Sequence, residues 1–348
     1  MTVLVTGGAG FIGSELVRQL VEQGANAVCC FDKLTYAGNL DSLDAVSNSD
    51  RFSFIRGDVC NPDQVEQALN ATECDTVYHL AAESHVDRSI DNPTEFAVTN
   101  VLGTLNLLQT VRTYWKRLGE EKRQRFRFIH VSTDEVYGAL GPEGEFTEET
   151  PFAPNSPYSA SKAAADHFAR SFFITYGMPV LITNCSNNYG AYQFPEKLVP
   201  LMINRAIENQ PLPVYGDGLQ IRDWLHVSDH CQALQLVAAE GDPGQTYNIG
   251  GECERTNLAI VEQICAEMDS QLGRPVGSSK QLIEFVDDRP GHDRRYAVDI
   301  SKIRRELGWS PTRDFETGFR ETIAWYINNR EWVERVASGE YLKRRGTG

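Results

Sequence analysis

The sequence lacks the features that mark secreted, zinc-binding and membrane-spanning proteins. Its eight cysteines are scattered, form no Cys-x-x-Cys pair and do not cluster with the seven histidines, so we expect neither disulfides nor a metal site. No apolar run approaches the roughly 20 residues that span a bilayer. A strand pattern follows Met1 directly, which disfavours a signal peptide. We therefore expect a reduced, cytoplasmic protein whose cysteines are mostly small buried residues.

Positive charge is also scarce. The 33 Lys and Arg residues are outnumbered by 48 Asp and Glu residues, which gives a net charge of -15. Nucleic acid and anionic membranes would repel such a surface at long range, so we expect neither as a partner. A phosphate-bearing ligand would need a local basic pocket. The chain also has no repeat or low-complexity linker, and its 348 residues with 41% hydrophobic content suit one large domain or two joined ones.

The first half of the chain alternates short apolar runs with amphipathic stretches. The apolar runs are Val3–Val5, Val28–Phe31, Thr76–Leu80 and Phe126–Val131, and the amphipathic stretch Ser14–Gln23 follows the first of them. This alternation is typical of successive βαβ units. It predicts an α/β fold of the Rossmann type, a doubly wound parallel sheet covered by helices on both faces.

Two long helices and a change of character complete the predicted organisation. One helix is expected from about Pro93 to Leu118, and another begins at Ser156-Pro157, where serine suits the N-cap and proline the first helical position. Beyond about Asn188, prolines and the turn-like Gly216-Asp217-Gly218 interrupt the rhythm. We expect a Rossmann domain over 1–190, to which segments near 225–250 return, and a smaller C-terminal substrate-binding region over 191–348. The last residues, 343–348, should be frayed.

A glycine-rich turn indicates a dinucleotide site. Thr6-Gly7-Gly8-Ala9-Gly10-Phe11-Ile12-Gly13 follows a strand and opens a helix, and Asp32 ends the next strand nineteen residues after Gly13. The glycines allow a tight turn, close approach to a pyrophosphate and close contact between helix and strand, while the helix N-terminus attracts phosphate. An ordinary glycine-rich turn is the alternative. Asp32 can bind both ribose hydroxyls and would repel a 2'-phosphate, which favours NAD over NADP, although neighbouring Lys33 weakens that preference.

Two further segments are candidates for the cofactor site. Asp58 follows an apolar run and could receive the adenine edge, but a turn or N-cap aspartate would look the same. Leu80-Ala81-Ala82 ends a strand with small residues, which would let a ligand lie close over the carboxyl edge of the sheet. Small residues packed under a helix would give the same pattern.

The spacing of Tyr158 and Lys162 indicates alcohol oxidation. They stand four residues apart on an expected helix, so both side chains project from one face. The charge of the lysine would lower the pKa of the tyrosine and make the phenolate available as a base. Ser132-Thr133 ends a strand at the edge where a nicotinamide should lie, and a hydroxyl there could share a substrate alcohol with Tyr158.

Two neighbouring carboxylates, Asp134 and Glu135, follow Thr133 directly. In a cleft, such groups push the pKa values of each other apart, so one can act as an acid while the other acts as a base. Dehydration needs one acid and one base of this kind. The alternative is that Asp134 caps a turn and Glu135 is solvated.

Several motifs together resemble the dTDP-glucose 4,6-dehydratases, which are extended short-chain dehydrogenases/reductases. The likeness reaches to about Trp332, and Ala191, where proline is expected, is a departure that concerns the stiffness of one loop. The motifs are the glycine-rich turn, His79-Leu80-Ala81-Ala82-Glu83-Ser84-His85-Val86-Asp87-Arg88-Ser89, Ser132-Thr133-Asp134-Glu135-Val136-Tyr137-Gly138, Tyr158-Ser159-Ala160-Ser161-Lys162, Asn187-Asn188-Tyr189-Gly190, Phe194-Pro195-Glu196-Lys197-Leu198, Arg222-Asp223-Trp224 and Asp288-Arg289-Pro290-Gly291-His292-Asp293.

The resemblance implies a cofactor, a substrate and the residues that bind them. The expected cofactor is NAD, bound by Gly7, Gly10, Phe11, Ile12, Gly13, Asp32, Lys33, Leu34, Thr35, Asp58, Val59, Leu80, Ala81, Ala82, Ser84, Thr99, Tyr158, Lys162 and Asn187. The expected substrate is dTDP-glucose, bound by Ser84, Thr133, Asn187, Glu196, Lys197, Leu198, Pro213, Val214, Tyr215, Arg222, Asn257, Arg289, His292 and Tyr296. Lys197, Arg222 and Arg289 would bind the diphosphate, since charge-assisted bonds suit phosphate oxygens, although each alone could be a solvated surface residue.

The resemblance also implies a redox-neutral reaction carried by Thr133, Asp134, Glu135, Tyr158 and Lys162. Tyr158, with Thr133 and Lys162, would take the proton of the sugar 4-hydroxyl while hydride passes to NAD. Glu135 would then remove the C5 proton, Asp134 would protonate the departing 6-hydroxyl, and the hydride would return to C6. His85 is expected to be structural.

Other interpretations stay open at this point. The same scaffold could serve a UDP-hexose 4-epimerase or a UDP-glucuronate decarboxylase, in which the Asp134-Glu135 pair would be changed. A non-catalytic NAD-binding regulatory protein is a further alternative, against which Thr133, Tyr158 and Lys162 argue. The resemblance implies a homodimer built through helices 93–118 and 157–176, but helices that cover the sheet would be equally apolar.

Overall fold

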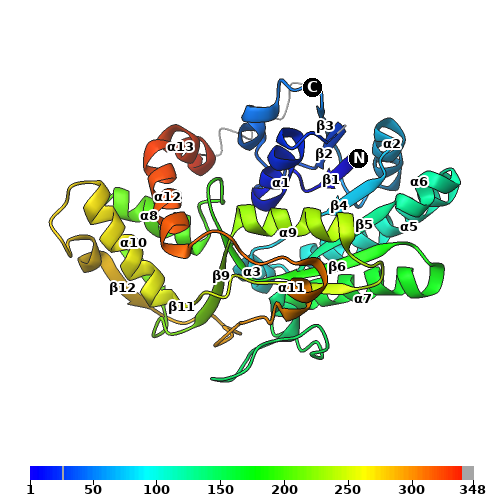
Figure 1. The fold of residues 1–348 in the computed structure, drawn as a ribbon. Helices are drawn as coiled ribbons and strands as arrows, with labels where there is room; N and C mark the ends of the chain where they lie inside the picture. Colours follow the sequence, from blue (N-terminus) through cyan, green and yellow to red (C-terminus); the bar gives the residue numbers. More distant parts are fainter. Residues whose placement is uncertain (26, 339–348) are drawn as a thin grey trace.

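A seven-stranded sheet forms the centre of the larger part of the molecule (Figure 1). The computed structural model describes residues 1–25 and 27–338. All neighbouring strands in this sheet are parallel, in the order β10-β6-β5-β4-β1-β2-β3. The strands are β1 (Thr2–Thr6), β2 (Ala27–Asp32), β3 (Phe52–Arg56), β4 (Thr76–His79), β5 (Arg127–Thr133), β6 (Val180–Cys185) and β10 (Thr246–Ile249). The predicted Rossmann-type α/β fold is confirmed.

Both faces of this sheet are buried, because successive side chains of a strand point to opposite faces. Val3 and Val5 join one apolar cluster, while Leu4 between them joins another. The first cluster includes helices α1 (Phe11–Glu22) and α9 (Val227–Glu240). The second includes α2 (Pro62–Thr72), α5 (Thr104–Arg117) and α7 (Pro157–Tyr176). The helices therefore form two layers around the sheet (Figure 1).

The helix expected over 93–118 is three helical segments in direct succession. They are α4 (Pro93–Phe96), a π-helical stretch η2 (Ala97–Gly103) and α5, and α6 (Glu120–Arg125) follows. Within η2, Asn100 is 1% exposed, donates to the carbonyl oxygen of Glu83 at 2.9 Å and accepts from its amide at 2.8 Å. The π-helical turn thus fixes the loop that follows β4. Side-chain periodicity cannot distinguish such a turn from an α-helix.

The second long helix, α7, begins as predicted. The hydroxyl of Ser156 accepts from the amide of Ser159 at 3.0 Å, and the hydroxyl of Ser159 accepts from the amide of Ser156 at 3.0 Å. Pro157 occupies the first turn, and Gly177 ends the helix in the left-handed conformation with φ of 66°. The start of α7 is therefore fixed firmly, which matters because Tyr158 and Lys162 lie in its first two turns.

A second apolar core lies beyond residue 190. It is formed mainly by α8 (Leu198–Ile207), α10 (Asn257–Gln271), α12 (Phe315–Asn328) and α13 (Arg330–Ser338). The smaller sheets are β7 (Asn187–Tyr189), β9 (Ile221–His226) and β11 (Glu254–Thr256), and β8 (Leu212–Tyr215) with β12 (Ile283–Val286). The remaining elements are α3 (Val86–Asp91), α11 (Ser301–Leu307), η1 (Leu40–Val46), η3 (Asp134–Tyr137) and η4 (Ser279–Leu282).

Several smaller expectations concern this region and the cysteines. Gly216 and Gly218 adopt φ of 58° and 69°, as a turn requires. All eight cysteines are free and six are buried. Over the described part of the chain, no helix is long and apolar enough to cross a bilayer, and no three or more His, Cys, Asp or Glu side chains gather where they could hold a metal ion. Residues 343–348, expected to be frayed, lie outside the described residues.

Candidate active site

A cleft of about 780 Å³ lies between the carboxyl ends of the sheet strands and the second core. Such crevices are the usual ligand sites of open α/β sheets. The cleft is lined by all the residues expected to bind cofactor or substrate or to act in catalysis, except Leu34 and Asp134. Leu34 has φ of 59° and packs in the first apolar cluster, and Asp134 is 2% exposed. The loops that carry the other residues converge on one space.

The glycine-rich turn is closed by backbone contacts that leave no room for side chains. A Cβ atom on Gly7 would lie 2.6 Å from the amide nitrogen of Ala81, and one on Gly13 would lie 2.1 Å from the carbonyl oxygen of Gly7. Helix α1 follows, and its N-cap residue is Gly10, which has no side chain to cap the first amides. Gly10, Phe11 and Ile12 line the cleft, so the positive dipole end of the helix lies where a pyrophosphate would bind.

Asp32 joins this turn to the next loop. Its carboxylate accepts from the amide of Ala9 at 3.0 Å and from the amide of Leu34 at 2.7 Å. Lys33 points toward Asp58, with its ammonium group 2.7 Å from the carboxylate. Asp58 also accepts from the amide of Cys60 at 2.9 Å, so it is a turn aspartate and a cleft residue at once. Burial favours its neutral form, but the bonds from Lys33 and Cys60 outweigh this and lower its pKa.

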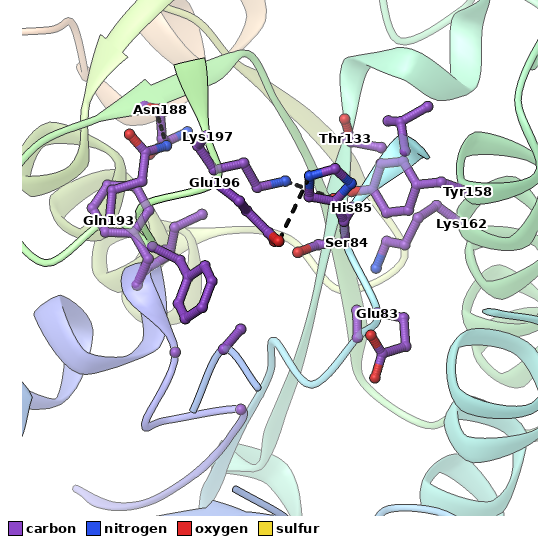
Figure 2. Close-up of a pocket in the computed structure, with 18 of the residues that line it drawn as sticks. Glu83, Ser84, His85, Thr133, Tyr158, Lys162, Asn188, Gln193, Glu196 and Lys197 are labelled. Carbon is purple, nitrogen blue, oxygen red and sulfur yellow. Dashed lines mark hydrogen bonds and ion pairs between the residues drawn. The ribbon is translucent and has the colours of Figure 1, made fainter. Parts of the chain in front are cut away.

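Three of the expected catalytic residues share one wall of the cleft. Figure 2 shows Thr133, from the end of β5, beside Tyr158 and Lys162 from the start of α7. The ammonium group of Lys162 donates to the carbonyl oxygen of Val131 at 2.8 Å. The hydroxyl of Thr133 accepts from the amide of Glu135 and lies within bonding distance of Asp134 Oδ1, both at 3.3 Å. Strand β5 and helix α7 therefore position the group together.

The pKa of Tyr158 differs from the sequence prediction. Burial, followed by the charge of Glu135, raises the pKa well above its usual value, whereas a hydrogen bond with Thr133 lowers it. Lys162 itself is buried, which lowers the pKa of its ammonium group. The prediction that the pKa of Tyr158 is lowered is wrong for the protein by itself, because the spacing in a helix says nothing about desolvation.

The two adjacent carboxylates occupy different environments. Glu135 lines the cleft, whereas Asp134 is buried and its Oδ2 atom has no hydrogen-bond partner among the described residues. Burial and then the charge of Glu135 raise the pKa of Asp134 well above the usual range. Burial also raises the pKa of Glu135, but the cations Arg222, Arg289 and Lys197 oppose that shift. Asp134 is thus the better acid, and Glu135 the better base.

These three cations form a local basic pocket in an acidic chain. Arg222 is 6% exposed, donates to the carbonyl oxygen of Asp293 at 3.0 Å and lies over the ring of Tyr296 at 4.3 Å. Arg289 lies 3.3 Å from Asp87, and Lys197 donates to the carbonyl oxygen of Ser84 at 2.8 Å. All three line the cleft. The arrangement could bind an anionic group within reach of the Tyr158 wall.

Glu196, which was expected at the substrate, lies in a cluster with Tyr36, His85 and Arg88 that was not predicted. Glu196 lies 3.7 Å from His85 and 3.6 Å from Arg88, whose guanidinium group stacks on Tyr36 at 3.6 Å. Figure 2 shows Glu196 reaching toward His85. Burial lowers the pKa of His85 to about 4, so the ring is neutral at pH 7. The sequence signal for this cluster is that His85 and Arg88 lie in the same motif as Leu80-Ala81-Ala82.

The remaining expected substrate residues lie around the same space. The imidazole of His292 is 2.7 Å from Asp288, and its ring meets that of Tyr215 edge-on at 6.3 Å. Tyr215 is 44% exposed, which leaves its ring open to a ligand. The other expected substrate residues along the cleft are Asn187, Leu198, Pro213, Val214 and Asn257.

Comparisons with known proteins agree with this geometry. A family model described as GDP-mannose 4,6 dehydratase matches residues 4–322. A dTDP-glucose 4,6-dehydratase of Neisseria meningitidis is 54% identical, with 99% of each chain covered. A solved dTDP-glucose 4,6-dehydratase of Streptomyces venezuelae, with NAD bound, has a TM-score of 0.88 and 44% identity over 97% of this chain and 100% of the other.

A more distant neighbour has the same fold. The UDP-glucose 4-epimerase of Thermus thermophilus, solved with NAD, has a TM-score of 0.83 but only 28% identity over 94% of this chain and 100% of the other. The fold alone therefore does not distinguish a dehydratase from an epimerase. The identity of 54% to a full-length dTDP-glucose 4,6-dehydratase, against 28% to the epimerase, does distinguish them. The chain therefore belongs to the dTDP-glucose 4,6-dehydratase family, among the extended short-chain dehydrogenases/reductases.

Proposed function

We propose that this protein is an NAD-dependent lyase that converts dTDP-glucose to dTDP-4-keto-6-deoxyglucose and water. The convergence of Thr133, Glu135, Tyr158 and Lys162 on one cleft carries the proposal, in a chain that belongs to this dehydratase family. The buried Asp134 beside Glu135 supplies the second carboxyl group that elimination needs.

The residues of the glycine-rich half fit NAD. The turn at Gly7 and Gly13 excludes side chains, the start of α1 presents amide groups, and Asp32 closes the loop where the ribose hydroxyls would lie. Lys33 is held by Asp58, which reduces its ability to attract a 2'-phosphate and so favours NAD over NADP. When bound, NAD would accept a hydride from C4 of the sugar and return it to C6.

Tyr158 is the proposed base for the 4-hydroxyl of the sugar. Burial keeps the phenol protonated in the protein by itself, so the phenolate needs support from neighbouring groups. The hydrogen bond with Thr133 gives part of that support. Lys162, one helical turn away on α7, is the cation that would add to it. Thr133 also offers its hydroxyl to the same sugar oxygen.

Elimination is assigned to the carboxylate pair. Glu135 faces the cleft and would take the C5 proton, which a neighbouring 4-ketone makes acidic. Burial favours the protonated form of Asp134, which would give its proton to the departing 6-hydroxyl. The bond between Thr133 and Asp134 links the acid to the residue that lines the site.

The second core is proposed to hold the nucleotide. Arg222, Arg289 and Lys197 would bind the diphosphate, while Pro213, Val214 and Tyr215 would lie beside the base. On this basis residues 1–190, with the segments near 225–250, form the NAD-binding unit, and 191–348 mainly the nucleotide-sugar unit. The choice of thymidine over uridine belongs to the same proposal.

A homodimer is proposed from exposed apolar side chains on the helical layer. Leu102 on η2 is 57% exposed, and Ile174 and Tyr176 on α7 are 63% and 42% exposed. A second copy that covers these side chains would remove them from water. Light scattering should give the mass of a dimer, and Leu102→Asp should shift it toward the monomer. A wild-type monomer would contradict the proposal.

The function is tested by weighing products. Purified protein is incubated with dTDP-glucose, UDP-glucose and UDP-glucuronate, and each product is analysed by mass spectrometry. We expect loss of one water from dTDP-glucose, without release of NADH. A product of unchanged mass would indicate epimerisation, and loss of carbon dioxide from UDP-glucuronate would indicate decarboxylation. Bound NAD without turnover of any sugar would favour a regulatory protein.

A further inference from the structure

A buried aspartate lies behind the wall that carries Tyr158 and has no role in the reaction proposed above. Asp166 is 2% exposed and lies on α7, four residues after Lys162. Its Oδ1 atom is 3.0 Å from Nε2 of His130. Its Oδ2 atom accepts from the hydroxyl of Ser132 at 2.8 Å and from the amide group of Asn184 at 3.2 Å. One carboxylate thus joins α7 to β5 and β6.

The partners of Asp166 are neighbours of the proposed catalytic residues. Ser132 precedes Thr133, and the same amide group of Asn184 also donates to the carbonyl oxygen of Thr133 at 3.2 Å. Lys162 donates to Val131, so the three residues 131–133 at the end of β5 are held from behind. Movement of Asp166 would therefore move both Thr133 and the anchor of Lys162.

The charges around Asp166 point to Lys162 as its counter-charge. His130 and neighbouring His79, whose rings are 5.4 Å apart, are both fully buried, and burial lowers the pKa of each. Lys162 makes the largest charge contribution that favours the ionised form of Asp166, and Asp166 makes the largest that favours the charged form of Lys162. The other titratable groups that interact with the pair are Tyr137, His167 and Cys185. Tyr158 lies beside Lys162 (Figure 2).

We propose that Asp166 is a positioning residue for the oxidation step. Its carboxylate, one helical turn after Lys162 on α7, is the buried negative charge that favours the ammonium form of that lysine, and its hydrogen bonds fix the end of β5 that presents Thr133. A residue that served only the fold would use these bonds for stability alone. The inference rests on the proposed function, because it assigns Asp166 to the support of that site.

The experiment compares the pH dependence of turnover in Asp166→Asn, Asp166→Glu and the wild type. Each holoenzyme is assayed with dTDP-glucose, and bound NAD and the unfolding temperature are measured in parallel. Without the carboxylate, Lys162 should lose its proton at lower pH, so the alkaline limb of the profile of Asp166→Asn should move down by about one unit or more. Asp166→Glu keeps the charge, so it should turn over more slowly but keep the alkaline limb of the wild type.

Asp269→Asn is the matched control, because Asp269 is also buried and accepts from Gly277, Ser278 and Ser279, but in the second core. It should lose stability and keep the wild-type profile. If Asp166→Asn does not fold, Asp166→Ser removes the same charge and should show the same shift. A wild-type alkaline limb in the uncharged variant, or an equal shift in Asp166→Glu, overturns the inference. If the wild type itself dehydrates no sugar nucleotide, the proposed function is wrong, and the role of Asp166 in it is wrong as well.

Discussion

Replacing Glu135 by Gln should separate the two halves of the proposed reaction. The change keeps the size of the side chain but removes the carboxylate that faces the cleft. Oxidation at C4 depends on Thr133, Tyr158 and Lys162, which stay in place. We therefore expect the variant to oxidise the sugar and then stop, with the cofactor held as NADH.

The structure gives both a size and a direction for this effect. Loss of a positioned general base slows the step it serves by about 10²- to 10⁴-fold, or about 3–5 kcal/mol of barrier. The oxidation step should not be slowed, because the charge of Glu135 raises the pKa of Tyr158 more than any other charge does. Removing that charge should lower the pKa of the phenol, so oxidation in Glu135→Gln should be as fast as in the wild type or faster at acidic pH.

The assay is a single turnover in heavy water. Absorbance of the reduced nicotinamide reports oxidation, and mass spectrometry of the recovered sugar reports exchange of the C5 hydrogen. Glu135→Gln should accumulate NADH without exchange. Asp134→Asn is the matched comparison, because it keeps the base and removes the acid, so it should accumulate NADH with exchange. Normal dehydration by Glu135→Gln, or exchange at the wild-type rate, would refute the assignment of the base.

Four further outcomes are expected. Tyr158→Phe should slow the appearance of bound NADH about 10²-fold or more while NAD content stays that of the wild type, as general-base loss implies; normal NADH formation would count against the phenol. Gly13→Ala should lose bound NAD, because the new Cβ would lie 2.1 Å from the carbonyl oxygen of Gly7, whereas Gly119→Ala, with open space around it, should retain NAD; retention by both would contradict the close-contact argument. Arg289→Ala should raise KM for dTDP-glucose about tenfold or more, as loss of a charge-assisted bond implies. Arg294 is 53% exposed and pairs with Asp217 on the surface, so Arg294→Ala should leave KM unchanged. Equal effects of the two substitutions on KM would show that Arg289 does not bind the diphosphate. Finally, because the folded pKa of Asp134 is raised, the wild type should lose stability as pH rises from the ordinary aspartate pKa toward that raised value, and thermal unfolding of Asp134→Asn should lack this component; identical pH dependence of the two melting curves would argue that Asp134 is ionised in the fold.

The regular parts of this molecule were predictable because their signals are local. Alternation of apolar runs located four of the seven sheet strands, β1, β2, β4 and β5, and Ser156-Pro157 located the start of α7. The glycine-rich turn could also be predicted, since its requirement for small residues is visible at Gly7 and Gly13. These features depend on neighbours within a few residues, or on a periodicity that the sequence displays directly.

The rest depends on burial and on distant partners. The spacing of Tyr158 and Lys162 placed both on one helix face, but it could not reveal that desolvation raises the pKa of the phenol. The depth of Asp134 and the bonds of Asp166 to β5 and β6 arise only when the strands lie side by side. Arg88 and Glu196 both lie in motifs that were predicted, but nothing in the sequence indicates that Arg88 contacts Glu196 and Tyr36.

The return of the chain to the main sheet constrains how this protein can be rebuilt. Strand β10 pairs with β6, and α9 packs on the face that α1 also covers, although both elements follow residue 190. A fragment cut at 190 would expose the β6 edge and strip that face of its cover. Chimaeras that graft the nucleotide half of a homologue onto this chain should therefore be spliced at several crossover points, since a single junction would leave each donor with an unfinished core.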